Sequence, residues 1–153
     1  MPVRTARVPG FTLVEVLIVV VILAILAAIV VPQFTGAANS TEAATTLAQL
    51  QMIRSQLALY QGQHNAYPNL STGWALLTGR SDSNGNSNST GPYGPYLQAA
   101  PLNPFTNSTA VTQQNDTNPL PAPAHGDANG WYYNVQTGAI EAARFNEITQ
   151  RGL

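Results

Sequence analysis

Hydrophobic residues follow two different patterns in the first 62 residues of the chain. From Val16 to Val31, sixteen apolar residues follow one another without a break. As a helix, residues 11–31 would span about 31 Å, because each helical residue advances the chain by ~1.5 Å. That length matches the hydrocarbon core of a bilayer. The first pattern therefore predicts one membrane-spanning helix near the N-terminus.

The second pattern is that of an amphipathic helix. Between residues 43 and 60, apolar residues recur every three or four positions, and polar residues such as Gln49 and Arg54 lie between them. The apolar positions are Ala43, Leu47, Leu50, Ile53, Leu57 and Tyr60. A stripe of this kind is typical of a helix face that packs on a core. It predicts a helix that covers the rest of the domain.

The boundaries of this second helix have their own signals. The stretch 33–39 contains Gly36 and is a weak helix, so we expect a joint there. Asn39 followed by Glu42 fits a cap and its partner at a fresh helix start. Gly62 is a natural helix end. We therefore expect the amphipathic helix to run from about residue 39 to residue 62.

After residue 62 the composition shifts to Asn, Gly, Pro and aromatic residues, and one hairpin stands out. Trp131, Tyr133 and Val135 alternate with polar positions, a turn follows at 136–138, and 139–142 can return as the partner strand. The pattern predicts an antiparallel pair. Its inward face, Trp131 and Tyr133, would pack on the helix stripe.

The remaining segments look irregular. Residues 79–91 are polar and of low complexity, which predicts an exposed loop. Residues 91–105 contain four prolines, so we expect no regular structure there, only apolar side chains that cover a surface. Those side chains are Tyr93, Tyr96, Leu97, Leu102 and Phe105. Residues 107–129 form a second polar loop, and the tail 144–153 is expected to fray.

Composition and charge exclude several function classes. The 153 residues include six Arg, no Lys, seven acidic residues and no Cys, for a formal net charge of −1. There is no basic surface for a nucleic acid, and no disulfide is possible. With two scattered His and no paired carboxylates, nothing favours an enzyme. His64 lacks a partner at regular spacing, so we expect it to be solvated rather than a ligand.

The start of the apolar run carries unusual charges. Arg4 and Arg7 precede it without a neighbouring acid, which favours a cytoplasmic N-terminus. Glu15 lies inside the first turn of the predicted helix 11–31. A carboxylate in lipid costs roughly 2.5–3.5 kcal/mol on insertion scales, so it calls for a partner or a function.

Residues 10–15, Gly-Phe-Thr-Leu-Val-Glu, resemble the prepilin signal of type IV pilins and type II secretion pseudopilins. The resemblance implies cleavage between Gly10 and Phe11, N-methylation of Phe11, and assembly into a filament with the apolar helices at its core. Glu15 would then neutralise the Phe11 amine of a neighbouring subunit. Pro32 matches a position where the family often has a helix-kinking proline.

Two other interpretations of the N-terminus remain open. A secretory signal peptide also begins with basic residues, but its apolar region is usually ~7–15 residues long and ends at a small-residue cleavage site. A plain single-pass anchor would leave Glu15 without a role, although carboxylates inside membranes are usually functional.

Residues 94–105 (GPYLQAAPLNPF) and 130–142 (GWYYNVQTGAIEA) resemble the major pseudopilins. The absence of Cys also favours pseudopilins over type IV pilins, many of which have a disulfide. The resemblance implies an α+β, pilin-like fold: a long N-terminal helix on a small C-terminal antiparallel sheet with long Pro-, Gly- and Asn-rich loops. The expected parts are a removed leader (1–10), a transmembrane and filament-core helix (11–31), an amphipathic extension (32–62) and a periplasmic globular domain (63–153).

The function that this resemblance implies is a structural subunit of a type II secretion pseudopilus, which drives protein secretion. A type IV pilin for adhesion, twitching or DNA uptake is the alternative, and a membrane-anchored enzyme is a distant one. Implied partners are further copies of the chain, the prepilin peptidase, the inner-membrane assembly platform, minor pseudopilins and lipid. The implied location is the bacterial inner membrane, crossed once, with the N-terminus in the cytoplasm.

Calcium is the remaining question. The major pseudopilin usually binds it through aspartates and carbonyls in a C-terminal loop, but no Asp follows the hairpin here. Asp116 and Asp127 lie earlier and lack the dense alternating carboxylates of a recognisable calcium loop. They are weak candidates only, and no cofactor is expected.

Overall fold

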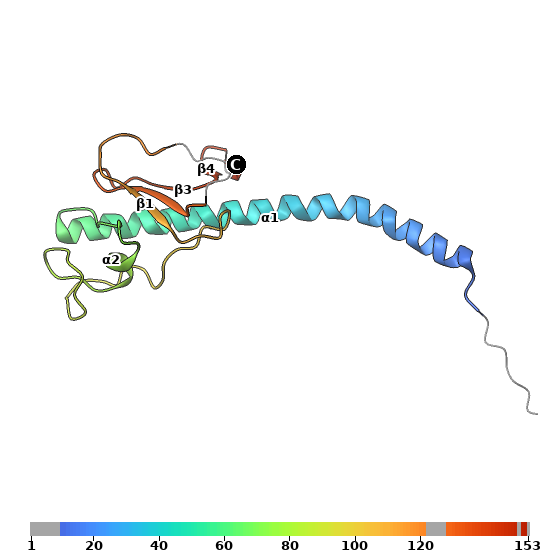
Figure 1. Cartoon of the computed structure of the whole chain (residues 1–153), viewed down its shortest axis with the longest axis horizontal. Coiled ribbons are helices and arrows are strands. Elements are labelled where there is room, and N and C mark those ends of the chain that lie inside the picture. The colour runs from blue at the N-terminus through green and yellow to red at the C-terminus, as the bar shows by residue number, and fades with distance from the viewer. Residues whose placement is uncertain (1–9, 122–127, 150, 153) are drawn as a thin grey trace, which may run out of the picture. The chain divides into compact units, whose positions relative to one another are not determined.

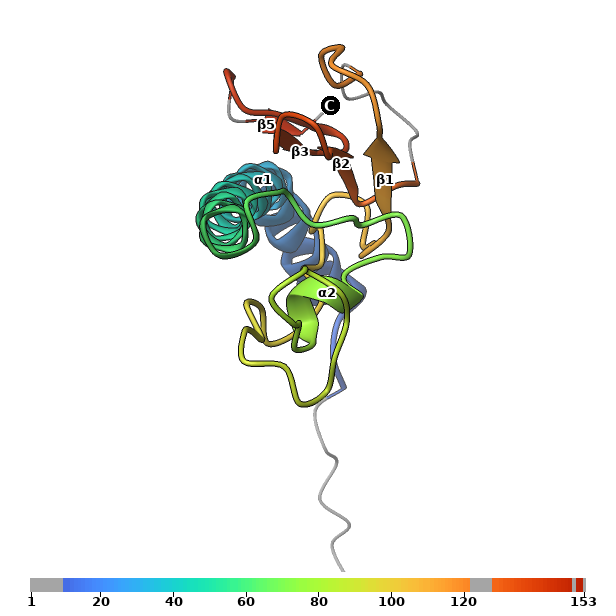
Figure 2. The same cartoon turned by 90° about the vertical axis from the view of Figure 1, so that its left-hand side faces the viewer.

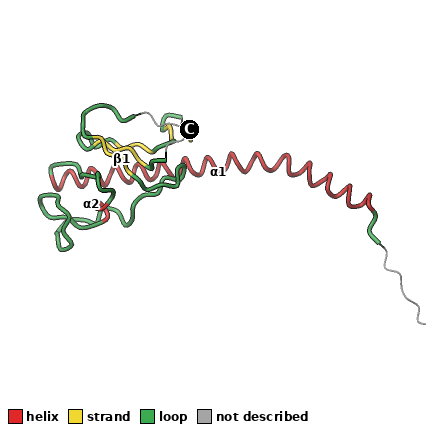
Figure 3. The backbone as a smooth tube through the Cα atoms, viewed as in Figure 1, coloured by secondary structure: helices red, strands yellow, loops and turns green. Residues whose placement is uncertain are grey.

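The computed structural model describes residues 10–121, 128–149 and 151–152. Helix α1 spans Leu13–His64 and helix α2 spans Ala75–Thr78 (Figures 1 and 3). The strands are β1 (Val111–Gln114), β2 (Trp131–Asn134), β3 (Ile140–Ala142), β4 (Phe145–Asn146) and β5 (Arg151–Gly152). The α+β class is confirmed. By its contacts the chain divides into two compact units, with the boundary between Ala38 and Asn39.

The N-terminal unit, residues 1–38, contains the apolar part of α1. Every side chain from Gly10 to Val30 is exposed. The segment Leu13–Val30 is long and apolar enough to cross a membrane, and none of it is buried within the molecule. The predicted apolar helix is confirmed, and none of the other described residues covers its side chains.

Helix α1 continues without interruption through residues 31–39, so the expected joint and fresh start at Asn39 are wrong. A cap needs a non-helical residue at its own position, and Asn39 is already inside a helix. One turn further on, the hydroxyl groups of Thr45 and Thr46 donate to the carbonyls of Thr41 and Glu42, both at 2.8 Å. The helix also passes Pro32, whose kink stays a prediction.

The helix ends two residues later than expected. It stops at His64, and the next residue, Asn65, has a φ of 55° and donates its N–H to the Gln61 carbonyl at 2.8 Å. Asn tolerates this left-handed conformation and commonly closes a helix in this way. The expected stop at Gly62 is wrong, because a helical glycine weakens a helix without ending it.

The predicted stripe on α1 is confirmed as the core face of the second unit. Five of its six residues are buried, and Leu47 is half-buried against them. Thr46 is also fully buried, which the apolar pattern missed. Its hydroxyl is satisfied by the Glu42 carbonyl one turn back, so burial leaves no donor unpaired.

The predicted hairpin is confirmed. Strands β2 and β3 pair antiparallel with Trp131 opposite Ala142 and Tyr133 opposite Ile140. The turn needs Gly138: its φ is 72°, and a Cβ there would lie 2.2 Å from the Tyr67 ring. Trp131 and Tyr133 are fully buried in the cluster that contains the α1 stripe.

The sheet is mixed rather than antiparallel. Strand β1, in the stretch that was expected to be a loop, pairs parallel to β2 with Val111 opposite Trp131, which gives the order β1-β2-β3. Its sequence, VTQQ, has one apolar residue and therefore lacks a strand pattern. Figure 2 shows the strands and α2 on different sides of the C-terminal half of α1.

Polar bonds attach the loops to this core. The Trp131 indole N–H donates to the Pro101 carbonyl (2.9 Å), and the Tyr133 hydroxyl donates to the Pro68 carbonyl (3.0 Å). Asn103, fully buried in the Pro-rich loop, donates to the carbonyls of Gly130 (2.7 Å) and Ala143 (2.9 Å). The loop 91–105 is irregular, as predicted, and the bonds made by Pro101 and Asn103 hold it to the core.

Three loop predictions need correction. Ser81 is fully buried within the stretch expected to be exposed, and its N–H donates to the Tyr93 carbonyl at 3.0 Å. Leu102 is 46% exposed and covers no core surface, although Tyr96 and Leu97 do. The tail does not fray where it is described: Phe145 is buried, and β4 pairs with β5.

Candidate assembly site

The first turn of α1 is closed by Thr12 and Glu15. The Thr12 hydroxyl accepts the Glu15 backbone N–H (3.2 Å), and Glu15 Oε2 accepts the Thr12 backbone N–H (2.8 Å). The Thr12 hydroxyl donates to the same oxygen (2.7 Å). This reciprocal pair is a capping box, which satisfies N–H groups that a helix start leaves free.

The pairing of Glu15 with Thr12 is not among the expectations from the sequence. The signal was present, because Thr-Leu-Val-Glu is the S/T-x-x-E pattern of a capping box directly before an apolar run. Within the part of the chain that the structure describes, these bonds to the carboxylate all fall on Oε2. Glu15 therefore has a local role in the helix start besides any role between subunits.

Gly10 and Phe11 precede this cap and are exposed, Phe11 to 79%. A Cβ added at Gly10 would meet nothing within 4 Å, and its φ is not in the left-handed region. The fold therefore places no steric demand for glycine at this position. A requirement for glycine at residue 10 would have to come from another molecule.

The other half of α1 carries a different pair. The Arg54 guanidinium meets both oxygens of Glu147, each at 2.8 Å, and also donates to the Ile140 carbonyl at 3.0 Å. This bidentate ion pair connects the C-terminal segment to α1. The hydrogen bonds from Arg54 lower the pKa of the Glu147 carboxyl. Spacing in the sequence gave no signal for a pair separated by 93 residues.

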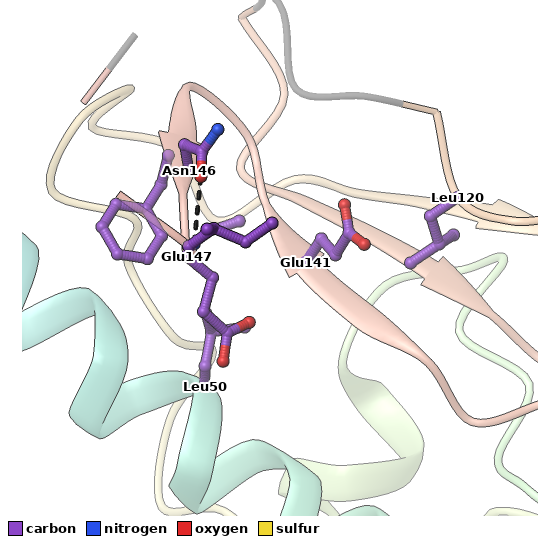
Figure 4. A pocket seen from close by; sticks show the side chains of 8 residues that line it. Leu50, Leu120, Glu141, Asn146 and Glu147 are labelled. Carbon is purple, nitrogen blue, oxygen red and sulfur yellow. Dashed lines mark hydrogen bonds between the residues drawn. The ribbon is translucent and has the colours of Figure 1, made fainter. Parts of the chain in front are cut away.

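Beside this pair lies a cavity of about 600 Å³, which we call the tail pocket (Figure 4). It is lined by Leu50 of α1, Leu120, Glu141 and Ala142 of β3, and residues 145–148. Burial raises the pKa of Glu141, while Glu147 is held by Arg54. Among the residues described, no three His, Cys, Asp or Glu side chains converge as a metal site. The described lining of the pocket thus combines apolar side chains with the Glu141 carboxylate, on which the charges of Arg54 and Glu147 act.

His64 is half-buried, so its expected solvation is wrong. Its Nε2 lies 3.1 Å from Ser81 Oγ and 3.0 Å from the Tyr96 hydroxyl. The rings of Tyr60 and Tyr93 lie 4.2 and 4.9 Å away. A Ser–His contact can signal a nucleophile, but Ser81 is fully buried, and Nδ1 has no hydrogen-bond partner in the described chain. These contacts pack Ser81, Tyr93 and Tyr96 against the C-terminal end of α1.

Of the two candidate calcium ligands, Asp116 is among the described residues. Asp127 lies outside the described residues. Asp116 is exposed in the loop after β1, where hydrogen bonds from Gln114 and from the Asn118 backbone lower the pKa of its carboxyl. No structural observation brings these two aspartates together.

A capped, fully exposed apolar helix that continues into a sheet-bearing unit defines a pilin-like, membrane-anchored subunit. Comparisons with known proteins narrow this class. Residues 6–31 match the prokaryotic N-terminal methylation motif, and residues 33–122 match the type II secretion system protein G model. No solved structure gives a significant match.

Curated relatives agree with these matches. The type II secretion system core protein G of Pseudomonas aeruginosa is 34% identical over 98 residues, which cover 64% of this chain and 68% of that protein. The protein of the same name from Aeromonas hydrophila is 31% identical over 101 residues, which cover 66% and 70%. The chain belongs to the type II secretion system protein G family, the major pseudopilins. It is a structural subunit of a pseudopilus. The family match favours this role over that of a type IV pilin.

Proposed function

We propose that this chain is cut between Gly10 and Phe11, is N-methylated at Phe11, and assembles through its apolar helix into a filament that drives secretion. The methylation-motif match at residues 6–31 supports the processing. The exposed apolar surface of Leu13–Val30 supports the assembly step, because no residue in the described ranges covers that surface. Lipid would cover it before assembly, and copies of the same helix would cover it afterwards.

The parts of the chain would then have separate tasks. Residues 1–10 form the leader, 11–31 the filament core, 32–62 the amphipathic extension and 63–153 the periplasmic domain, with Pro32 as a kink between the first two helical parts. The subunit would cross the inner membrane once, with its N-terminus in the cytoplasm. The prepilin peptidase, the assembly platform and minor pseudopilins would be its partners. We expect no enzymatic turnover and no nucleic-acid binding.

Glu15 would carry the specific contact between subunits. Cleavage exposes the Phe11 α-amine as a cation, and a carboxylate is its natural partner in a low-dielectric filament core. In the uncut chain the same carboxylate caps the helix through Thr12. The proposal therefore assigns Glu15 two roles that mutagenesis can separate, since only one of them needs the charge.

The matched variants are Glu15→Gln, Glu15→Ala and Thr12→Ala. Glutamine also completes a capping box, so Glu15→Gln keeps the cap and removes the charge. Thr12→Ala does the reverse. With the full chain expressed alongside its secretion machinery, we expect filaments in the sheared fraction from Thr12→Ala and none from either Glu15 variant. Filaments from Glu15→Gln at the wild-type level would show that the cap, not the charge, is what assembly needs.

A further inference from the structure

The loop that follows β1 is attached to the sheet by two side-chain amides. Gln114 and Asn134 end β1 and β2 and lie opposite each other in the parallel ladder. Asn134 is 1% exposed. Because a buried amide without partners would be costly, the bonds that these two side chains make decide the structure of the loop 115–118.

Asn134 uses its full hydrogen-bonding capacity. Its Oδ1 accepts the backbone N–H groups of Gln136 (2.9 Å) and Thr137 (3.1 Å) in the hairpin turn. Its Nδ2 donates to the carbonyls of Asp116 (2.9 Å) and Asn118 (3.0 Å). The two N–H donors fix which end of the amide is oxygen, so the NH₂ group must face the loop.

Gln114 completes the arrangement. Its Nε2 donates to the Asn118 carbonyl at 3.1 Å and to Asp116 Oδ1. The Asp116 carboxylate also accepts the backbone N–H of Asn118 (3.0 Å) and its side-chain Nδ2 (2.8 Å). The loop oxygens that point inward are therefore already paired with N–H donors.

This arrangement does not fit a calcium ion. Calcium takes about six to eight oxygen ligands at roughly 2.3–2.6 Å. Here the point where the Asp116 and Asn118 carbonyls converge is occupied by the Asn134 NH₂ group, whose hydrogens carry partial positive charge. A cation there would have to displace the amide and break its bonds to both carbonyls.

We propose that Gln114 and Asn134 form an amide clasp that does in this chain what a divalent cation would do, so the sheet-bearing unit folds without calcium. The inference concerns folding and does not depend on the assembly proposal. The clasp links the β1 loop to the β2–β3 turn through protein donors alone. Asn134 is the positioning residue at its centre.

The test is thermal unfolding of the detergent-solubilised full chain, in EGTA and in excess calcium chloride. We expect the wild-type Tm to be the same in both. Asn134→Ala should lower the Tm by about 5 °C or more, the shift expected when a small domain loses ~1 kcal/mol or more. Gln136→Ala removes an exposed amide from the same turn and should leave the Tm unchanged. Asn134→Ala melting with the wild type would overturn the clasp.

Asn134→Asp sharpens the test, because it replaces the NH₂ donor with a carboxylate oxygen beside Asp116 and the two carbonyls. That donor set suits calcium. We expect this variant to melt below the wild type in EGTA and to regain stability in calcium. A wild-type Tm that rises when calcium replaces EGTA would overturn the proposal, and this result needs no variant at all.

Discussion

The two units of this chain are stabilised in opposite ways. In the apolar part of α1, no residue from Leu13 to Val30 is buried within the described part of the chain, and the Thr12–Glu15 cap stands at its start. The unit from Asn39 onward buries a helix stripe, two tryptophans and several polar residues. The apolar side chains of the first unit need other molecules to cover them, whereas the second unit forms a core from its own residues. Substitutions should therefore act on assembly in one unit and on folding in the other.

The largest effect on folding should come from the buried centre of the second unit. Trp131→Ala removes a fully buried ring that contacts Trp74 edge-on at a centroid distance of 6.3 Å. We expect a loss of about 3–5 kcal/mol in the free energy of unfolding, measured by denaturant unfolding of the solubilised full chain.

The matched control for Trp131→Ala is Leu23→Ala in the apolar helix, where Leu23 is 57% exposed. The same measurement should show no change in the unfolding of the second unit. If Leu23→Ala destabilised that unit as strongly as Trp131→Ala, the contrast between the two units would be wrong.

A smaller effect is expected from the buried loop amide. Asn103→Ala removes the amide donor of the Ala143 carbonyl, whereas the Gly130 carbonyl keeps the Ala143 backbone N–H. An unsatisfied buried polar group costs about 1–3 kcal/mol, so unfolding should become easier by that amount. The exposed Asn84 serves as control, and its replacement by Ala should change stability by less than ~0.5 kcal/mol. Equal effects at both positions would contradict the role given to Asn103.

The smallest effect should come from the half-exposed pair of Arg54 and Glu147. Exposed ion pairs contribute only about 0.2–1 kcal/mol, and Arg54→Met should cost no more than that. Since Arg54 lowers the Glu147 pKa, the pair stabilises the fold above the carboxyl's unfolded pKa of ~4.3. That contribution disappears as the pH falls through the lower folded value.

Unfolding measured at pH 7 and pH 3 checks this assignment. The stability difference between wild type and Arg54→Met should shrink at the lower pH. A difference that grows on acidification would contradict the ion pair as the cause.

Sequence pattern predicted those elements whose signal is local and repeated. The apolar run at 16–31 and the stripe from Ala43 to Tyr60 are confirmed, and so are the buried Trp131 and Tyr133 of β2. The alternation in β2 stops at Asn134, which is buried although it is polar. Strand β1 has no such pattern, because its sequence VTQQ contains one apolar residue and two glutamines. Its pairing with β2 is made by the backbone. Pairs such as Arg54–Glu147 or Asn103–Gly130 join residues far apart in sequence, so they become visible only in the fold.

At the candidate assembly site, too, the sequence indicates residues that belong to a local motif and does not indicate long-range pairs. Gly10, Phe11 and Glu15 could be selected from a contiguous motif, but their processing and assembly roles remain proposals. Thr12 carries a local signal as well, because Thr12 and Glu15 have the spacing of a capping box, although the charge of Glu15 alone does not point to it. The clasp of Gln114 and Asn134 could not be found from spacing, since twenty residues and a strand pairing separate the two amides.

The most direct test of the proposed pathway is the intact mass of the membrane-extracted protein, expressed together with its prepilin peptidase. Cleavage after Gly10 followed by methylation predicts a chain that begins at Phe11 and carries one additional methyl group. Gly10→Leu should remain uncut, although the fold itself tolerates a side chain there. A wild-type chain that keeps residues 1–10, or one cut after the apolar run, would contradict the assignment.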